Sequence, residues 1–204
     1  MAELADALDL GSVTTVELLP RQLKTGDYQI GIGVLQMIAF KELCIEEIDY
    51  FWDLLNALDN ETNYMMYEPN ERAQCTNIQE LCADIRSNVI NGADFLLIAS
   101  EDDKIVGYIR AERGKFRRNF HTAYIVVGVL RDYSGKGIGT TFFKELDKWA
   151  SQNCVRRLEL TVECRNHAAR HLYEKSGFRI EGTRAKSMLV EGNFVDEYYM
   201  AKIL

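Results

Sequence analysis

From residue 37 onward, the hydrophobic and polar positions of this chain follow two periods. Continuous or alternating apolar runs typical of strands cover residues 37–43, 95–99, 104–112, 121–130, 157–164, 178–190 and 194–203. Apolar stripes with helical spacing lie within residues 48–58, 78–89, 138–149 and 169–173. The resulting order, β-α-α-β-β-β-α-β-α-β-β, predicts an α/β (α+β) fold with a mixed sheet flanked by helices.

Local signals indicate where some of the predicted helices begin and end. Thr76 and Gln79 have the spacing of a capping box, which predicts a helix start at this place. Asn166 is a typical N-cap residue and stands before the last helical stripe. Gly177 follows that stripe and is typical of the residue just beyond a helix end.

Residues 1–36 lack this regular pattern. The run Ala-Glu-Leu-Ala-Asp-Ala-Leu-Asp-Leu-Gly-Ser resembles peptides that arise when a reading frame is extended through a neighbouring transfer-RNA gene. We therefore expect the natural start at Met37, and the alternative is a genuine N-terminal appendage. The sequence predicts a leader at residues 1–36, either not native or poorly ordered, and one domain at residues 37–204.

Composition and charge restrict the classes of function. The 204 residues are 47% hydrophobic and 27% charged, which suits one domain with a sizeable core. The net charge is −7 and no long basic run occurs, which argues against a nucleic-acid partner, because such binding needs clustered Lys and Arg. An acidic surface favours cationic small molecules such as amines.

Cysteines, histidines and apolar runs bear on metals and on the compartment. The chain has five cysteines without a Cys-x-x-Cys pair and only three histidines, so no metal is expected and the thiols are expected to be reduced. The apolar run at residues 30–40 is too short to cross a bilayer, and the first residues lack the basic region of a secretion signal. We therefore expect a cytoplasmic protein without a membrane partner.

The stretch Ser134-Gly135-Lys136-Gly137-Ile138-Gly139 joins a predicted strand to a predicted helix. Glycines allow the backbone to approach a ligand closely, and the first helical turn presents unpaired N–H groups at a positive dipole end. The stretch therefore predicts a seat for a phosphate or pyrophosphate, with a plain tight turn as the alternative. It is not a Walker loop, because Lys136 precedes Gly137, nor a dinucleotide fingerprint, because Phe142 replaces the last glycine.

Two motifs in order carry a family resemblance. Val129-Leu130-Arg131-Asp132-Tyr133-Ser134-Gly135-Lys136-Gly137-Ile138-Gly139 resembles the acetyl-CoA-binding motif of the GNAT superfamily of N-acetyltransferases. Asn166-His167-Ala168-Ala169-Arg170-His171-Leu172-Tyr173-Glu174-Lys175-Ser176-Gly177-Phe178 resembles its second signature, Asn-x-x-Ala-x-x-Leu-Tyr-x-x-x-Gly-Phe. The resemblance covers residues 37–204 and is strongest to small bacterial members that acetylate amino acids or related amines. It implies a mostly antiparallel sheet that is split between its fourth and fifth strands.

The resemblance implies that acetyl-CoA lies in the gap between strands 121–130 and 157–164. Its pantetheine arm would pair with the first strand, its pyrophosphate would bind loop amides, and Asn166 would reach the pantetheine or its phosphate side. The implied cofactor-binding residues are Val127, Gly128, Val129, Ser134, Gly135, Lys136, Gly137, Ile138, Gly139, Thr140 and Asn166. The family usually has Arg or Gln at the position of Ser134, so pyrophosphate binding here would rely on backbone amides and Lys136.

The implied reaction is direct attack of an amine on the thioester. The amine must lose a proton, because its usual pKa of about 8 to 10.4 keeps it charged at neutral pH. Tyr173 is the candidate general acid, since a phenol with a pKa of ~10 can protonate a thiolate whose thiol has a pKa of ~8.5; packing of its ring alone is the alternative. Glu159 or Glu163, which share a strand face, is the candidate base, with Glu112 or a water chain as alternatives.

The sequence leaves the acceptor amine open. Tyr64, Tyr67 and Glu68 lie in the loop where the family shapes its amine pocket, and we expect a small-molecule amine or an amino acid as the acceptor. Acetylation of a protein N-terminus, and a CoA-binding sensing module without turnover, are the alternatives. The last two predicted strands would allow two chains to pair as a homodimer.

Overall fold

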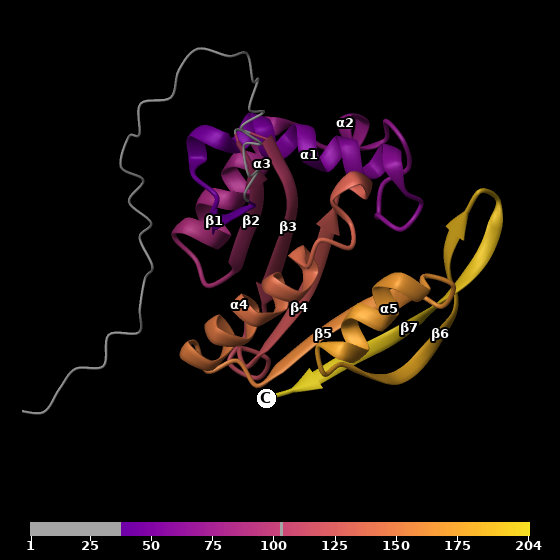
Figure 1. The fold of residues 1–204 in the computed structure, drawn as a ribbon. Helices are drawn as coiled ribbons and strands as arrows, with labels where there is room; N and C mark the ends of the chain where they lie inside the picture. The colour runs from indigo at the N-terminus through magenta and orange to yellow at the C-terminus, as the bar shows by residue number, and fades with distance from the viewer. Residues whose placement is uncertain (1–37, 103) are drawn as a thin grey trace, which may run out of the picture. The chain divides into compact units, whose positions relative to one another are not determined.

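The structure, a computed structural model, describes residues 38–102 and 104–204 (Figure 1). The expected leader at residues 1–36, the expected start Met37 and Asp103 lie outside the described residues. From residue 38 onward, strands and helices follow one another in the predicted order, with short helical segments added between them.

The described strands form one mixed sheet of seven strands. They are β1 (Ala39–Glu42), β2 (Phe95–Glu101), β3 (Lys104–Arg113), β4 (Thr122–Val129), β5 (Arg157–Glu163), β6 (Arg179–Val190) and β7 (Asn193–Ile203). Their order across the sheet is β1-β2-β3-β4-β5-β7-β6, and all neighbours are antiparallel except β4 and β5. The predicted mixed, mostly antiparallel sheet is confirmed. β6 is an outer strand, and pairing of two chains through the last strands stays a prediction.

Helices cover both faces of the sheet. They are η1 (Ile45–Glu47), α1 (Ile48–Glu61), α2 (Arg72–Cys75), α3 (Ile78–Asp84), the π-helical η2 (Ile85–Ile90), η3 (Arg131–Tyr133), α4 (Ile138–Gln152) and α5 (His167–Lys175). Phe51 of α1 packs edge-on against Tyr108, whereas Phe142 of α4 packs against Phe40. These contacts are on opposite faces, because Tyr108 shares a row across the sheet with Lys41, the neighbour of Phe40. Within residues 38–102 and 104–204, none of the helices has the length and apolar character needed to span a bilayer.

The predicted apolar stripe of α4 faces the core. Ile138, Phe142 and Leu146 are buried, and Trp149 stacks on Phe95 with ring centroids 5.3 Å apart. Burying a large apolar side chain stabilises a fold by roughly 1.5–3 kcal/mol, so this stripe holds α4 firmly against the sheet. The start of α4, where the glycine-rich loop ends, is thereby fixed.

β4 and β5 separate along their length. They pair only at residues 122–124 of β4 and 157–159 of β5. Beyond these rows β4 stays paired with β3, and β5 stays paired with β7, but the two strands no longer pair with each other. The sheet is therefore split between its fourth and fifth strands, as the resemblance implied, and one edge of β4 has no strand partner (Figure 1).

The start of α3 differs from the prediction by one residue. Asn77 is the N-cap, because its backbone is extended and its Oδ1 accepts a hydrogen bond of 3.0 Å from the Glu80 N–H. The predicted Thr76–Gln79 capping box is therefore wrong. Thr76 supports the same turn in another way, since its hydroxyl donates to the Glu80 carboxylate at 2.7 Å.

The predicted ends of α5 are confirmed. Asn166 is its N-cap, and the Asn166 Oδ1 accepts a hydrogen bond of 3.1 Å from the Ala169 N–H. Gly177 follows the helix with a φ of +94°, a left-handed conformation that favours glycine. α5 thus begins directly after β5, which places both elements beside the split.

Candidate active site

A cavity of about 880 Å³ lies in the split between β4 and β5. Its wall comes from the end of α1 and the following loop, the free edge of β4, the glycine-rich loop, the first turn of α4, the far half of β5, and α5. The predicted residues that line it are Tyr64, Val127, Gly128, Val129, Ser134, Gly135, Gly137, Ile138, Gly139, Thr140, Glu163, Asn166 and Tyr173. The predicted residues outside its wall are Tyr67, Glu68, Glu112, Lys136 and Glu159.

The three loop glycines have two different roles. Gly135 and Gly137 have φ angles of +76° and +84°, and a Cβ on either would meet no heavy atom within 4 Å. Their backbone conformation, rather than lack of space, favours glycine there. At Gly139 a Cβ would lie 2.6 Å from the Leu172 Cδ2, so the missing side chain lets α4 approach α5 closely. The sequence predicted ligand approach and unusual dihedrals for all three glycines; the dihedrals are found at Gly135 and Gly137, and the packing at Gly139 was missed.

The N-terminus of α4 is open to an anion. Gly137 is the N-cap residue and supplies no side-chain oxygen to the first amides of the helix, and no acidic residue stands in the first turn. Ile138, Gly139 and Thr140 form that turn and line the cavity. Uncapped amides at a positive helix end suit a phosphate group.

Two cations, Arg131 and Lys136, belong to the segment that joins β4 to α4. Lys136 lies outside the cavity wall, with its Nζ 4.4 Å from the ring centroid of Tyr133, which does line the cavity. Arg131 lines the cavity directly. Two hydrogen bonds connect it to the end of α1: its backbone N–H donates to the Glu61 Oε2 at 2.9 Å, and its guanidinium donates to the Glu61 carbonyl. Sequence reasoning missed Arg131, although its place within the first motif was a usable signal.

Tyr173 combines a packed ring with an unpaired hydroxyl. The residue is 8% exposed, and its ring meets that of Phe143 edge-on, with centroids 5.7 Å apart. Burial raises the pKa of the Tyr173 phenol, with smaller contributions from Tyr124 and Tyr108, so the hydroxyl stays protonated at neutral pH. No described residue forms a hydrogen bond with this hydroxyl, although Tyr173 lines the cavity. Both sequence interpretations, packing and a proton donor, fit this geometry.

The two candidate bases lie on the walls of different cavities. Glu163 is 7% exposed, lines the larger cavity and accepts a hydrogen bond of 2.7 Å from the Arg165 Nε. Glu159 lines a second cavity of about 350 Å³ and accepts a hydrogen bond of 2.7 Å from the Arg157 Nε. Arg157 also donates to Glu181. Its hydrogen bond to Glu181 raises the pKa of the guanidinium most, and its hydrogen bond to Glu159 adds a smaller increase. Glu159 is therefore engaged in an ion-pair group on the wall of the second cavity, which Tyr173 does not line.

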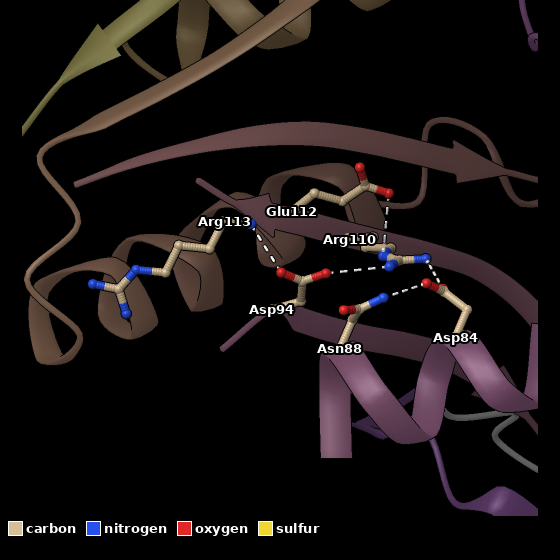
Figure 2. Close-up of polar contacts among 6 residues, drawn as sticks. All are labelled: Asp84, Asn88, Asp94, Arg110, Glu112 and Arg113. Carbon is tan, nitrogen blue, oxygen red and sulfur yellow. Dashed lines mark hydrogen bonds and ion pairs between the residues drawn. The ribbon is translucent and has the colours of Figure 1, made fainter. Parts of the chain in front are cut away.

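Glu112, the alternative base, belongs to the polar network in Figure 2. Arg110 lies at its centre: it donates to Asp84 at 2.6 Å and to Asp94 at 3.2 Å, and its Nε lies 3.4 Å from the Glu112 Oε1. Burial is the largest single influence on Asp84 and would raise its pKa, but the hydrogen bond and charge of Arg110, with the hydrogen bond from Asn88, together outweigh burial and lower it. Glu112 is thus an ion-pair partner on the wall of the second cavity.

Tyr124 lines both cavities. Its hydroxyl and the Thr161 Oγ1 are 2.9 Å apart, which forms a hydrogen bond from β4 to β5. This bond lies at the point where the two strands separate. Sequence reasoning missed both residues, because nothing in the sequence shows which rows of the two strands come together.

A buried ion pair holds the loop between α1 and α2. Asp59 is 1% exposed and accepts hydrogen bonds of 2.6 and 3.0 Å from Arg72. The Arg72 guanidinium in turn lies 4.5 Å from the ring centroid of Tyr67. Tyr67 therefore packs on the ion pair rather than on the cavity wall, whereas Tyr64, from the same loop, lines the cavity.

Comparison with known proteins identifies the class of enzyme. Residues 51–178 match the family described as the acetyltransferase (GNAT) family. The match spans more than half of the chain, so this protein belongs to the GNAT family and is an acetyltransferase. The family predicted from the two sequence motifs is confirmed.

One relative is similar to this chain in sequence, and solved structures are similar to it in fold. The chain is 34% identical over 111 residues to the L-amino acid N-acetyltransferase AaaT of Escherichia coli (strain K12), which is 52% of this chain and 67% of that protein. It is similar to a GNAT-family acetyltransferase structure from Streptococcus pneumoniae, with a TM-score of 0.77, 26% identity and coverage of 82% of this chain and 100% of the other. It also shares the fold of yncA from Salmonella typhimurium, solved with its cofactor acetyl-CoA, with a TM-score of 0.72, 17% identity and coverage of 82% and 94%.

Proposed function

We propose that this acetyltransferase transfers the acetyl group of acetyl-CoA to the primary amine of an amino acid or a related small amine. The similarity to an E. coli L-amino acid N-acetyltransferase supports this acceptor class. The observation that carries the proposal is Tyr173, which lines the same cavity as the open N-terminus of α4 and whose hydroxyl has no hydrogen-bond partner among the described residues. A proton donor and a phosphate seat in one cavity are what acetyl transfer from a coenzyme A thioester requires.

The cavity wall suits coenzyme A. The edge of β4 at Val127, Gly128 and Val129 has no partner strand and offers backbone groups to an extended pantetheine arm. The amides of the glycine-rich loop would hold the diphosphate, and Arg131 adds a positive charge on the same wall. Ser134 brings no charge, so Arg131 compensates for the Arg or Gln that the family usually has at that position.

Glu163 and Tyr173 divide the proton transfers. The acceptor ammonium gives one proton to the Glu163 carboxylate, and the freed nitrogen lone pair forms a bond to the carbonyl carbon of the thioester. The carbon–sulfur bond breaks with its electron pair on sulfur, and Tyr173 gives its proton to that sulfur. The second proton lost by the nitrogen restores the phenol, and Glu163 releases the first proton to solvent. We favour Glu163 over Glu159 because only Glu163 lines this cavity.

A substrate panel tests the proposed function. The full chain is incubated with acetyl-CoA and, separately, with the amino acids, polyamines, aminoglycosides and ribosomal N-terminal peptides. Acetylated product is measured by mass spectrometry, because thiol reagents would also react with the exposed Cys44, Cys75 and Cys154. Turnover of amino acids or small amines supports the proposal. Turnover of peptides alone would instead indicate acetylation of a protein N-terminus. CoA binding with no turnover of any amine would indicate a CoA-binding sensing module.

A further inference from the structure

β5 and β7 bring two acidic residues directly opposite each other. Glu163 pairs with Glu197 in the antiparallel register, so both side chains point to the same face of the sheet. Glu163 is 7% exposed, Glu197 is 8% exposed, and both line the larger cavity. Like charges directly opposite each other on neighbouring strands are destabilising. Two carboxylates in this arrangement need compensating positive charges.

Two arginines neutralise the pair from outside the cavity. The Arg165 Nε donates to the Glu163 Oε2 at 2.7 Å, and the Arg184 NH1 donates to the Glu197 Oε2 at 3.1 Å. Neither arginine lines the cavity, and their side chains are 52% and 53% exposed. The Oε1 atom of each glutamate receives no hydrogen bond from a described residue and is not fully buried. Each carboxylate, on a residue that lines the cavity, therefore keeps one oxygen that a ligand can bind.

Other groups of the same wall indicate what the cavity holds. The Tyr173 hydroxyl, on a side chain 8% exposed, has no hydrogen-bond partner among the described residues. Met65, Met66 and Met188 add flexible apolar surface from the loop after α1 and from β6. The wall thus combines unpaired oxygens, two of them on negative groups, with apolar contacts. An alkyl or aralkyl ammonium ion has the matching chemistry, because its N–H groups are all donors and its substituent is apolar.

We propose that Glu163 and Glu197 together form the subsite for the acceptor's ammonium group. This inference rests on the proposed function: Glu197 binds the cation and orients it, while Glu163 both binds it and takes its proton. The subsite selects amines that are charged in solution over neutral alcohols of the same shape. Sequence reasoning missed Glu197, because its position opposite Glu163 depends on the β5–β7 register.

Benzylamine and benzyl alcohol test the selectivity of this subsite without chemistry. Each is titrated by calorimetry into the full chain saturated with CoA, which carries no acetyl group. We expect benzylamine to bind at least tenfold more tightly than benzyl alcohol, because charge-assisted hydrogen bonds are stronger than neutral ones. In Glu197→Gln, which keeps the side-chain shape, this preference is expected to fall at least tenfold. Equal binding of both probes by the native chain, no binding of benzylamine, or an unchanged preference in the variant would each overturn the inference.

Steady-state kinetics separate binding from folding effects. In Glu197→Gln, the KM for the fastest amine of the panel is expected to rise at least tenfold, while the KM for acetyl-CoA stays the same and kcat changes less than threefold. Glu181→Gln is the matched control, because this exposed carboxylate on β6 pairs with Arg157 outside the larger cavity. A KM effect of equal size in the control, or a fall in kcat alone in Glu197→Gln, would contradict the subsite.

The two proposals fail in different ways. If the native chain binds benzylamine in a Glu197-dependent manner but turns over no amine, the proposed function fails and the ammonium subsite stands. If amines are acetylated but Glu197→Gln leaves their KM unchanged, the subsite fails and the proposed function stands.

Discussion

Replacing Tyr173 with Phe separates its two possible roles. The substitution keeps the ring and its edge-on contact with Phe143, and removes only the hydroxyl. Because that hydroxyl has no hydrogen-bond partner among the described residues, its removal breaks no protein bond. The free energy of unfolding is therefore expected to stay within about 1 kcal/mol of the native value or to rise.

Catalysis responds differently to the same substitution. A general acid contributes roughly 10²–10⁴-fold to the rate, so losing it raises the activation barrier by about 2.7–5.5 kcal/mol. In Tyr173→Phe we expect kcat to fall at least ~10²-fold while CoA affinity is nearly unchanged. Tyr173→Ala is the comparison for packing: it removes a side chain that is 8% exposed, and its unfolding free energy is expected to fall by about 3–5 kcal/mol.

Three measurements decide the outcome: product formation by mass spectrometry at saturating acetyl-CoA, CoA affinity by calorimetry, and urea unfolding followed by circular dichroism. Full activity in Tyr173→Phe would remove the phenol from the mechanism. A large loss of stability in that variant would show that the hydroxyl has a structural partner, and would refute the reasoning from its unpaired state.

Further predictions concern the loop, a buried ion pair and pH. Gly137→Ala and Gly192→Ala each place a side chain at a positive φ in open space, so each is expected to lower the unfolding free energy by about 1 kcal/mol. Only Gly137→Ala should weaken CoA binding in calorimetry. Equal CoA affinity in both variants would contradict the role of the glycine-rich loop in binding the diphosphate. Asp59→Ala leaves the Arg72 guanidinium, on a side chain that is only 12% exposed, without its partner, and we expect a loss of about 3 kcal/mol in urea unfolding. A loss below about 1 kcal/mol would show that the pair is not structurally important. The pKa of Asp84 is lowered from its ordinary value of 3.8, so its ion pair stabilises the fold above that pH and the contribution is lost as the pH falls through the folded-state pKa. Thermal unfolding between pH 7 and pH 2 should therefore show a smaller acid-induced decrease in Asp84→Asn than in the native chain, and identical decreases would refute this assignment.

The strands and helices were predictable where the apolar pattern was strong. The stripe of Ile138, Phe142 and Leu146 gave α4 because these residues recur at helical spacing and are buried. The start of α3 was harder, because Thr76 and Asn77 are both good capping residues with extended backbones, and the hydrogen bond from the Glu80 N–H to the Asn77 Oδ1 distinguishes them. The split between β4 and β5 came from the family resemblance, since three paired rows carry no signal of their own in the sequence.

The candidate site was predictable in its motifs but not in its carboxylates. Glu159 and Glu163 share one strand face by the two-residue period, so the sequence cannot say which one lies beyond the point where β4 and β5 separate. Glu197 is more than 30 positions from Glu163 along the chain and meets it only through the β5–β7 register. Arg131 gave a weaker signal, because a charged residue in a loop is more often a solvated surface group.

Amide hydrogen exchange with and without CoA tests most directly whether the cleft between β4 and β5 binds the coenzyme. We expect saturable slowing of exchange in peptides that cover residues 125–129 and 135–140, and no change in β1 at the far edge of the sheet. Unchanged exchange at both segments under saturating CoA, or slowing confined to other parts of the chain, would contradict the account.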